Sequence, residues 1–437
     1  MRRSLLLTAS ALIVFSPLRT AAQVTGLSGW NIFIDAGHSL TANMGAHGYS
    51  EAEKNLGVAL ELYDLLVTTT DIDTVFLSRT QQSDDVGLSQ RSDMANSAFG
   101  TGQPASWFHS LHSNASSNST ANSVLMLWGQ YRDGAEKVPN GGRAMSAIML
   151  DNLADGMRLP WTGQGSYGDC SFYGCSGDGP YLSVNRRTVM PSELSEAGFH
   201  SNSVQNQRNM GAAWKRMEAY TFYWSILAYH GIARSAVGIA IGHIRNVEGG
   251  RLLNGAVATV QGKGDTTDTY EGLFHRYTSD PDLLRNGFYF LEGLTGDSLE
   301  IIFSADNYYA DTVQVIRADS FFTFVDVGLA PKEPLGTEVV ARNLPPELLL
   351  HSNFPNPFNS LTHISFSLPT DGVVDLRVYD ILGREVALLD RQRRQPGRYQ
   401  VVWNGRTEAG RAVPSGVYFA RLIMPGGSRS IKMILLK

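Results

Sequence analysis

The sequence predicts a multidomain protein in which an α/β domain, with a mostly parallel or mixed sheet flanked by helices, precedes two small all-β sandwich domains. The chain has 437 residues, which exceeds the ~100–200 residues of a typical domain. From Asn31 to about His230, short apolar runs alternate with helical periodicity, as in sheets covered by helices. From about Ala236 onward the pattern changes to strands and turns, which favours sandwich domains.

Residues 1–23 have the order of a secretory signal peptide. Two arginines precede an apolar run from Leu5 to Phe15, and the small residues Ala21 and Ala22 come just before the end of the segment. The run is too short to span a bilayer comfortably, so a membrane anchor is the weaker interpretation. We therefore expect a mature chain without a transmembrane anchor outside the cytoplasm.

Composition excludes some partners and suggests one cross-link. The net charge of -5 argues against nucleic acid as a partner. The chain has two cysteines, Cys170 and Cys175, close together in a Gly-rich stretch. In an oxidising compartment a local disulfide is the favoured interpretation, and free thiols or metal ligands are the alternatives.

The first domain is expected over residues 24–233. Its candidate strands are the short apolar runs 32–34, 75–77, 106–108 and 124–127. A helix with one apolar face is predicted between the first two strands by the spacing of Leu56, Ala59, Leu60, Tyr63 and Leu66. A second long helix is predicted from about Val204 to Tyr229.

Two β domains are expected after it, at residues 236–330 and 351–437, joined by a linker at 331–350. In the first of them, residues 312–315 alternate between polar and apolar side chains. In the second, Ile364, Phe366 and Leu368 face one way while the serines between them face the other. This period of two is typical of half-buried strands.

Four short polar segments of the first domain carry its candidate catalytic groups. They are residues 35–38, 50–53, 110–114 and 191–199. His38 ends the turn after the first strand, where Gly37 lets the backbone bend, and His112 closes the strand that begins near Trp107. Both imidazoles are then expected at the carboxyl edge of the sheet, where α/β proteins build their sites. His47 is a weaker candidate, and His109 should face the opposite side of its strand.

Two glutamates compete to be the carboxylate ligand. Ser50 and Glu53 fit a capping box, in which Glu53 reaches back to the backbone of Ser50. Glu51, at the first helical position, then remains available to point toward the strand edge. Two histidines and a carboxylate can bind zinc and leave a position open for water.

A further carboxylate completes the equipment of a metallohydrolase. Glu196 is expected at the same sheet edge, where it can accept a proton from water and return it to a departing amine. Glu193 should face elsewhere. Asp35, Ser110 and Asn114 are weaker candidates for hydrogen-bonding partners that orient the ligands.

Residues from about Ile32 to Tyr229 resemble zinc-dependent N-acetylmuramoyl-L-alanine amidases of the amidase-3 type. The motifs that carry the resemblance occur in order: Asp35-Ala36-Gly37-His38, Glu51 before Asn55-Leu56, Ser110-Leu111-His112-Ser113-Asn114, and Pro191 followed by Glu196-Ala197-Gly198-Phe199. The resemblance implies that His38, Glu51 and His112 hold one zinc ion and that Glu196 is the catalytic carboxylate. It also implies peptidoglycan as substrate, cut at the amide between N-acetylmuramic acid and L-alanine.

The later domains carry resemblances of their own. Residues 236–330 loosely resemble transthyretin-like, carboxypeptidase-regulatory modules. Residues 351–437 resemble a C-terminal sorting domain of type IX secretion, through the segments 378–386, 403–406, 415–418 and 432–437. This implies the type IX secretion machinery as a partner and export from the periplasm to the exterior or the cell surface. An adhesive or carbohydrate-binding module is the alternative.

Three functions from different classes remain open at this stage. The amidase is favoured because all four chemical positions are present. A zinc peptidase acting on peptidoglycan stem peptides is the second hypothesis. A catalytically silent wall-binding surface protein is the third, because folds outlive their chemistry.

Overall fold

A computed structural model describes residues 24–98, 100–139, 141–234, 238–248, 250–267, 285–318, 321–332, 347–351, 353, 356, 358, 362–408 and 411–436. The expected signal peptide at 1–23 and most of the expected linker at 331–350 lie outside the described residues. The chain divides into two compact units, Met1–Lys332 and Glu333–Lys437. Within the described ranges, no helix combines the length and the apolar character that crossing a bilayer requires.

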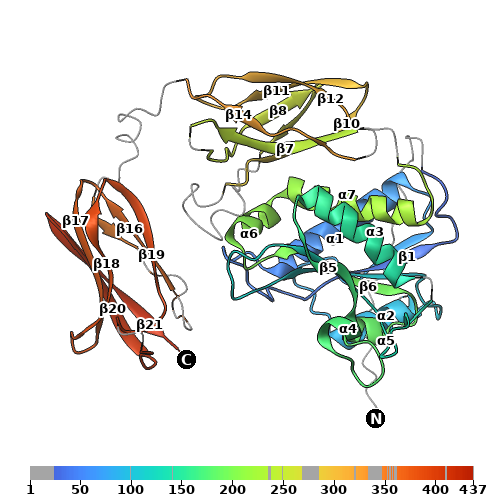
Figure 1. The fold of residues 1–437 in the computed structure, drawn as a ribbon, viewed down its shortest axis with the longest axis horizontal. Coiled ribbons are helices and arrows are strands. Elements are labelled where there is room, and N and C mark those ends of the chain that lie inside the picture. Colours follow the sequence, from blue (N-terminus) through green and yellow to red (C-terminus); the bar gives the residue numbers. More distant parts are fainter. Residues whose placement is uncertain are drawn as a thin grey trace, which may run out of the picture. The chain divides into compact units, whose positions relative to one another are not determined.

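The first unit begins with an α/β domain (Figure 1). Its sheet runs in the order β2-β1-β3-β6-β4-β5. The strands are β1 (Asn31–Ala36), β2 (Thr74–Leu77), β3 (Phe108–Asn114), β4 (Val124–Trp128), β5 (Trp161–Gly168) and β6 (Ser192–Phe199). Neighbouring strands from β2 to β6 are parallel, whereas β4 runs antiparallel to β6 and parallel to β5. The predicted α/β class with a mixed sheet and helices is confirmed.

Helices cover both faces of this sheet. They are α1 (Glu51–Thr69), α2 (Leu88–Ser97), α3 (Gly142–Met157), α4 (Asp169–Tyr173), α5 (Ser183–Arg187), α6 (Ser203–Met210) and α7 (Ala212–Tyr229). Figure 1 shows α1, α3 and α7 on one face and α2, α4 and α5 on the other. Each layer has its own apolar core, with Ile32 and Trp214 in the first and Phe33 and Phe108 in the second.

Two local predictions differ from the structure. The single helix predicted from about Val204 to Tyr229 is divided into α6 and α7, because Gly211 adopts an extended conformation with φ -69° and ψ 132°. The strand predicted at 106–108 starts at Phe108 and continues to Asn114, so His112 lies inside β3 and not at its end. Tertiary pairing with β1 and β6 supports this extension.

The first unit continues with a β region. Its strands are β7 (Gly238–Asn246), β8 (Val257–Val260), β9 (Lys263–Thr266), β10 (Phe288–Leu294), β11 (Ser298–Ser304), β12 (Asp311–Ile316), β13 (Thr323–Phe324) and β14 (Val327–Leu329). One sheet runs β10-β7-β13, with β14 also paired to β7, and the other runs β12-β11-β8-β9. Ile241 and Phe288 share a core with Trp214 and Phe222 of α7, so this region packs on the α/β domain.

The second unit is also β-rich. Its strands are β15 (Leu349–Leu350), β16 (Thr362–Leu368), β17 (Gly372–Asp380), β18 (Glu385–Arg394), β19 (Gly397–Trp403), β20 (Gly416–Met424) and β21 (Gly427–Leu435). They form sheets in the orders β15-β16-β19 and β18-β17-β20-β21. The predicted alternation in β16 holds, because Ile364, Phe366 and Leu368 are all buried in the core around Trp403. The prediction of β-rich regions after the α/β domain is therefore confirmed.

Candidate metal centre

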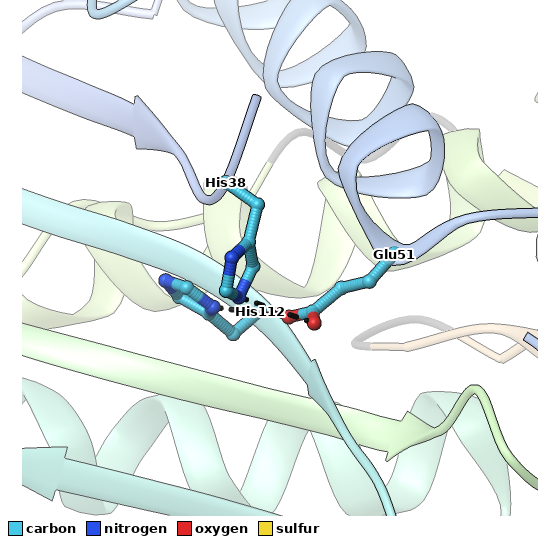
Figure 2. A group of neighbouring side chains, drawn as sticks. All are labelled: His38, Glu51 and His112. Atoms are coloured by element: carbon cyan, nitrogen blue, oxygen red, sulfur yellow. Dashed lines mark hydrogen bonds and ion pairs between the residues drawn. The ribbon is translucent and has the colours of Figure 1, made fainter. Parts of the chain in front are cut away.

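His38, Glu51 and His112 come together at one edge of the α/β sheet (Figure 2). They belong to the turn after β1, the first residue of α1, and β3. One nitrogen or oxygen atom from each side chain lies within 4.8 Å of the others. We refer to these three residues as the ligand cluster.

The start of α1 determines which glutamate joins the cluster. Ser50 is the N-cap residue, and its Oγ accepts a hydrogen bond from the backbone N–H of Glu53 at 3.2 Å. In return, Oε2 of Glu53 accepts from the backbone N–H of Ser50 at 3.0 Å. The predicted capping box is confirmed, and it ties Glu53 to the helix end. Glu51 instead accepts from the backbone N–H of Ser113 at 2.9 Å and contacts Nδ1 of His112 at 3.0 Å.

Gly37, in the turn after β1, is required for a reason that differs from the one expected from the sequence. The left-handed conformation falls on His38, with φ 61°, and not on Gly37. A Cβ on Gly37 would lie 2.4 Å from Nε2 of His112 and 2.3 Å from the backbone oxygen of Leu111. Position 37 therefore requires glycine because the ring of His112 approaches its backbone directly.

The electrostatics of the cluster favour an ionised carboxylate. Burial opposes the charge on Glu51, but hydrogen bonds from His112 and His38 outweigh it and hold the pKa of Glu51 well below its usual range. Nδ2 of Asn43 also donates to Oε2 of Glu51 at 2.6 Å. Two imidazoles and one ionised carboxylate form the nitrogen and oxygen donor set that suits a divalent ion such as zinc.

Glu196 lies next to the cluster on the neighbouring strand. It is the register partner of His112 in the parallel pair of β3 and β6. Its Oε2 is buried and, among the described residues, has no hydrogen-bond partner. Burial raises the pKa of Glu196 well above its usual range, and the charge of Glu51 raises it further, whereas Lys54 opposes the shift. An unpaired carboxyl group with a raised pKa is suited to proton transfer.

Glu193 and His109 point away from the cluster, as the strand period predicted. They are also register partners on β6 and β3, and both side chains are fully buried. Nδ1 of His109 lies 3.0 Å from Oε1 of Glu193, and Nε1 of Trp107 donates to Oε2 of Glu193 at 2.7 Å. Both oxygens of Glu193 are therefore engaged within the core, whereas Nε2 of His109 is buried and has no hydrogen-bond partner among the described residues.

The weaker candidates form contacts of their own. Ser110 donates to Oδ2 of Asp35 at 2.7 Å, and Oδ1 of Asp35 lies 3.4 Å from Arg91. Oδ1 of Asn114 accepts from the backbone N–H of Ala115. Across the described residues, none of the three candidates hydrogen-bonds to a side chain of the ligand cluster. His47 likewise contacts Ser203 at the start of α6, outside the cluster.

Two further residues border the cluster and were missed in the sequence. Lys54 is fully buried, forms an ion pair with Glu218 of α7 at 2.5 Å, and donates to the backbone oxygen of His112 at 3.2 Å. Nδ1 of His200 lies 3.8 Å from Oε2 of Glu51. The available signals were the one-turn spacing of Lys54 from Glu51 and the position of His200 directly after β6.

A cavity of about 530 Å³ opens beside the cluster. It is bounded by His38 and His112, by the loop residue Leu40, and by Leu88 and Arg91 of α2. Leu40 and Leu88 are exposed there. The cavity therefore offers an apolar rim with a buried arginine beneath it.

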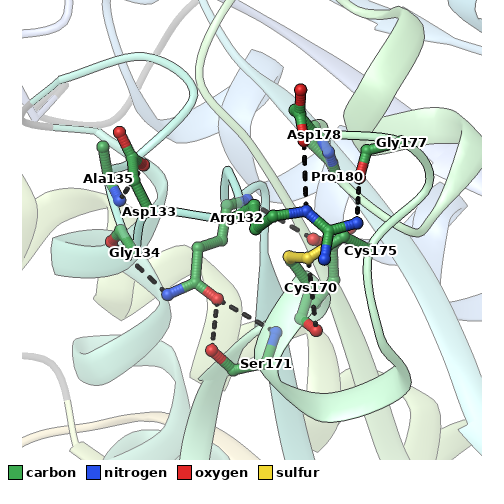
Figure 3. Close-up of a disulfide and its surroundings, with 12 residues drawn as sticks. Arg132, Asp133, Gly134, Ala135, Cys170, Ser171, Cys175, Gly177, Asp178 and Pro180 are labelled. Carbon is green, nitrogen blue, oxygen red and sulfur yellow. Dashed lines mark hydrogen bonds and ion pairs between the residues drawn. A yellow bond between two sulfur atoms is a disulfide. The ribbon is translucent and has the colours of Figure 1, made fainter.

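The segment from Cys170 to Cys175 begins in α4, on the face of the sheet that α2 also covers (Figure 1). Cys170 and Cys175 are joined by a disulfide, and Figure 3 shows it beside Arg132 and Ser171. Close in sequence to this disulfide, the exposed rings of Tyr173 and Tyr181 stack with centroids 5.0 Å apart. Burial, together with the nearby charge of Glu196, raises the pKa of Tyr173 to about 12.

An α/β domain with a histidine and carboxylate cluster at one sheet edge, beside an unpaired glutamate, has the arrangement of a metal-dependent hydrolase. Comparison with known families then gives the domain its identity. Residues 32–227 match the family of N-acetylmuramoyl-L-alanine amidases of the amidase-3 type. The match covers less than half of the chain, and it supports N-acetylmuramoyl-L-alanine amidase activity for this domain.

Several solved structures resemble part of the chain. The catalytic domain of CwlV, an N-acetylmuramoyl-L-alanine amidase from Bacillus (Paenibacillus) polymyxa var. colistinus, is 23% identical, with a TM-score of 0.38 over 46% of this chain and 99% of that one. An N-acetylmuramoyl-L-alanine amidase from Clostridium difficile 630 is 22% identical, with a TM-score of 0.38 over 46% and 96%. The amidase AmiC2 of Nostoc punctiforme is 20% identical, with a TM-score of 0.37 over 47% and 98%. Among curated proteins, no sequence matches the chain.

Proposed function

We propose that this chain is a secreted, zinc-dependent amidase that hydrolyses the bond between N-acetylmuramic acid and L-alanine in peptidoglycan. The observation that carries the proposal is the ligand cluster, whose donor atoms lie within 4.8 Å of one another beside the unpaired Oε2 of Glu196. His38, Glu51 and His112 would hold the zinc ion. Zinc bound there would act as a Lewis acid toward the amide carbonyl and make water a stronger acid.

The protein's own groups account for the proton transfers. Glu196 accepts the proton of the attacking water at Oε2 and returns it to the nitrogen of the departing L-alanine. Burial raises the pKa of Glu196, so its carboxyl group holds an accepted proton more strongly than an exposed glutamate would. Lys54 fixes the backbone oxygen of His112 and thereby the strand that carries this ring.

Analysis of reaction products tests this function. Purified protein should release intact stem peptides with a free L-alanine amine from peptidoglycan, as measured by mass spectrometry. Cleavage within the stem peptides would instead assign the protein to the zinc peptidases. Binding to the wall without any released product would assign it to the silent wall-binding proteins.

The route out of the cell is a separate part of the proposal. It rests on the order of residues 1–23 and on the segments of residues 351–437 that resemble a type IX sorting domain. A reporter fused to a signal peptide and to residues 351–437 should reach the exterior or surface of a cell that has type IX machinery. Retention of this fusion in the periplasm would contradict the proposed sorting role and favour an adhesive or carbohydrate-binding module.

A further inference from the structure

A second cavity lies between the α/β domain and the β region of the first unit, and no residue of the ligand cluster lines it. Its volume is about 150 Å³, and its walls include Arg158 after α3, Arg208 of α6, Trp214 of α7, and His243 and Arg245 of β7. A cavity of this size takes one small chemical group, because sites for drug-sized ligands occupy ~300–1,000 Å³.

The side chains that line this cavity carry an excess of positive charge. Three guanidinium groups line it, from Arg158, Arg208 and Arg245, against a single carboxylate from Asp326. That carboxylate is already engaged, since its Oδ2 pairs with Arg158 at 2.7 Å and its Oδ1 accepts from the backbone N–H of His243 at 2.8 Å. Arg245 lies farther from it, at 3.6 Å.

Arg208 lacks an anionic partner. In the described part of the chain, no carboxylate lies within ion-pair distance of it, and its Nε is buried without a hydrogen-bond acceptor. Its guanidinium lies over the ring of Trp214, with Cζ 5.0 Å from the ring centroid. Burial lowers the pKa of Arg208, and the charge of Asp326 opposes this shift without forming a direct ion pair, so the cavity beside Arg208 favours negative charge.

Two more buried groups around the cavity are unsatisfied. Nε1 of Trp214 and Nε2 of His243 have no hydrogen-bond partner among the residues that the structure describes. Buried polar groups are normally paired, and several unpaired ones around one cavity indicate a bound molecule or water. Together with the excess of guanidinium groups, they favour an acceptor-rich anion.

We propose that this cavity is a binding site for a small oxyanion, a carboxylate or phosphate group, held chiefly by the guanidinium of Arg208. The planar fork of arginine matches both groups in a bidentate arrangement. The rings of Trp214 and Phe288 form part of the wall and lower the local polarity, which strengthens that pairing. Since the cavity joins α6 and α7 to β7, an occupant would also hold the β region on the α/β domain.

Calorimetric titration of the full-length chain tests the site, with inorganic phosphate and acetate as separate probes at constant ionic strength. Saturable binding of one anion per chain is expected, at least ~10-fold weaker in Arg208→Gln because a charge-assisted bidentate pair is lost. Arg143→Gln is the matched control, because Arg143 is an exposed arginine of the same unit and lies outside the cavity. It should bind as the wild type does. The probe that binds more tightly shows whether the site prefers a phosphate or a carboxylate group.

Two results would overturn the proposal. Equal affinity in wild type and Arg208→Gln would place any bound anion elsewhere, including at the metal centre. The absence of saturable binding by either probe would leave the cavity to water alone. If Arg208→Gln does not fold, Arg245→Gln serves instead, because the side chain of Arg245 is only partly buried and loss of its charge should also weaken binding.

Discussion

Strands β3 and β6 carry two pairs of a histidine and a glutamate. The pairs have the same composition but differ in burial and in hydrogen bonding. His109 and Glu193 are register partners, and so are His112 and Glu196, three residues further along both strands. The first pair is fully buried and hydrogen-bonded to itself and to Trp107. In the second pair, the histidine contacts Glu51 and the glutamate keeps a buried oxygen without a partner.

The position of each pair in the sheet, and not its residue types, therefore decides whether it has a structural or a chemical role. An odd offset along a strand sends one pair to the core face and the other to the opposite face, near the carboxyl edge of the sheet. In the core, both oxygens of Glu193 are held by Trp107 and His109, so this carboxyl group is not available for proton transfer. At the edge, an unsatisfied carboxyl group next to the ligand cluster is available for reaction.

Replacement of the edge glutamate should give the largest effect. Glu196→Gln keeps the shape of the side chain but removes the proton acceptor, so kcat on peptidoglycan should fall by ~10²–10⁴-fold. Zinc content should stay at the wild-type level, because Glu196 is not in the ligand cluster. Assays of product release and metal content check both points, and wild-type kcat in this variant would reject Glu196 as the base.

Replacement of the core glutamate should affect stability instead. Glu193→Ala leaves His109 and Trp107 without their buried acceptor, which should lower the free energy of unfolding by about 3–5 kcal/mol. Activity per folded molecule should change little at a temperature where the variant remains folded. Denaturant unfolding and active-site titration separate the two quantities. A selective loss of kcat without loss of stability would mean that the two pairs are not distinct in role.

Adding a methyl group beside His112 tests whether the close packing of its ring sets the affinity for zinc. Gly37→Ala places its Cβ against the ring of His112, so the ring must move and zinc affinity should fall by ~10–100-fold, the range for groups that position metal ligands. Gly179→Ala is the control, because the nearest atom to its added Cβ is 3.8 Å away. Competition with a zinc chelator measures both variants. Equal affinities would contradict the close approach at position 37.

A third histidine and carboxylate pair, His243 and Asp326, should give the smallest effect. Burial disfavours the charge of Asp326, but hydrogen bonds from His243 and Arg158 outweigh it and keep the pKa of Asp326 well below its usual range. A lowered folded-state pKa stabilises the protein above the unfolded pKa of ~3.9, and this stabilisation is lost as pH falls toward the folded value. The Tm of wild type should therefore exceed that of Asp326→Asn near pH 7, and the gap should narrow below about pH 4. A gap that is independent of pH would contradict an ionised Asp326.

Features set by neighbouring residues could be predicted from the sequence. The capping box of Ser50 and Glu53 is local, so it separated Glu53 from Glu51 before any fold was known. Strand period likewise separated His109 from His112. The buried alternation of β16 followed from its own residues.

Features set by long-range packing could not be predicted. Lys54 and Glu218 are separated by 164 positions, and only the contact between α1 and α7 brings them together beneath His112. The antiparallel direction of β4 depends on its pairing with β6, which no local pattern specifies. The reason for glycine at position 37 is a contact with β3, which no local pattern of residues 35–38 records.

Zinc titration of a matched pair of variants tests the central claim most directly. Glu51 and Glu53 occupy the same turn of α1. Glu53 belongs to the helix cap, and Glu51 is the proposed metal ligand. Wild type should bind one zinc ion per chain, Glu53→Gln should bind it with similar affinity, and Glu51→Gln should lose more than the ~10–100-fold typical of groups outside the ligand set. Wild-type zinc affinity in Glu51→Gln would contradict the proposed metal centre.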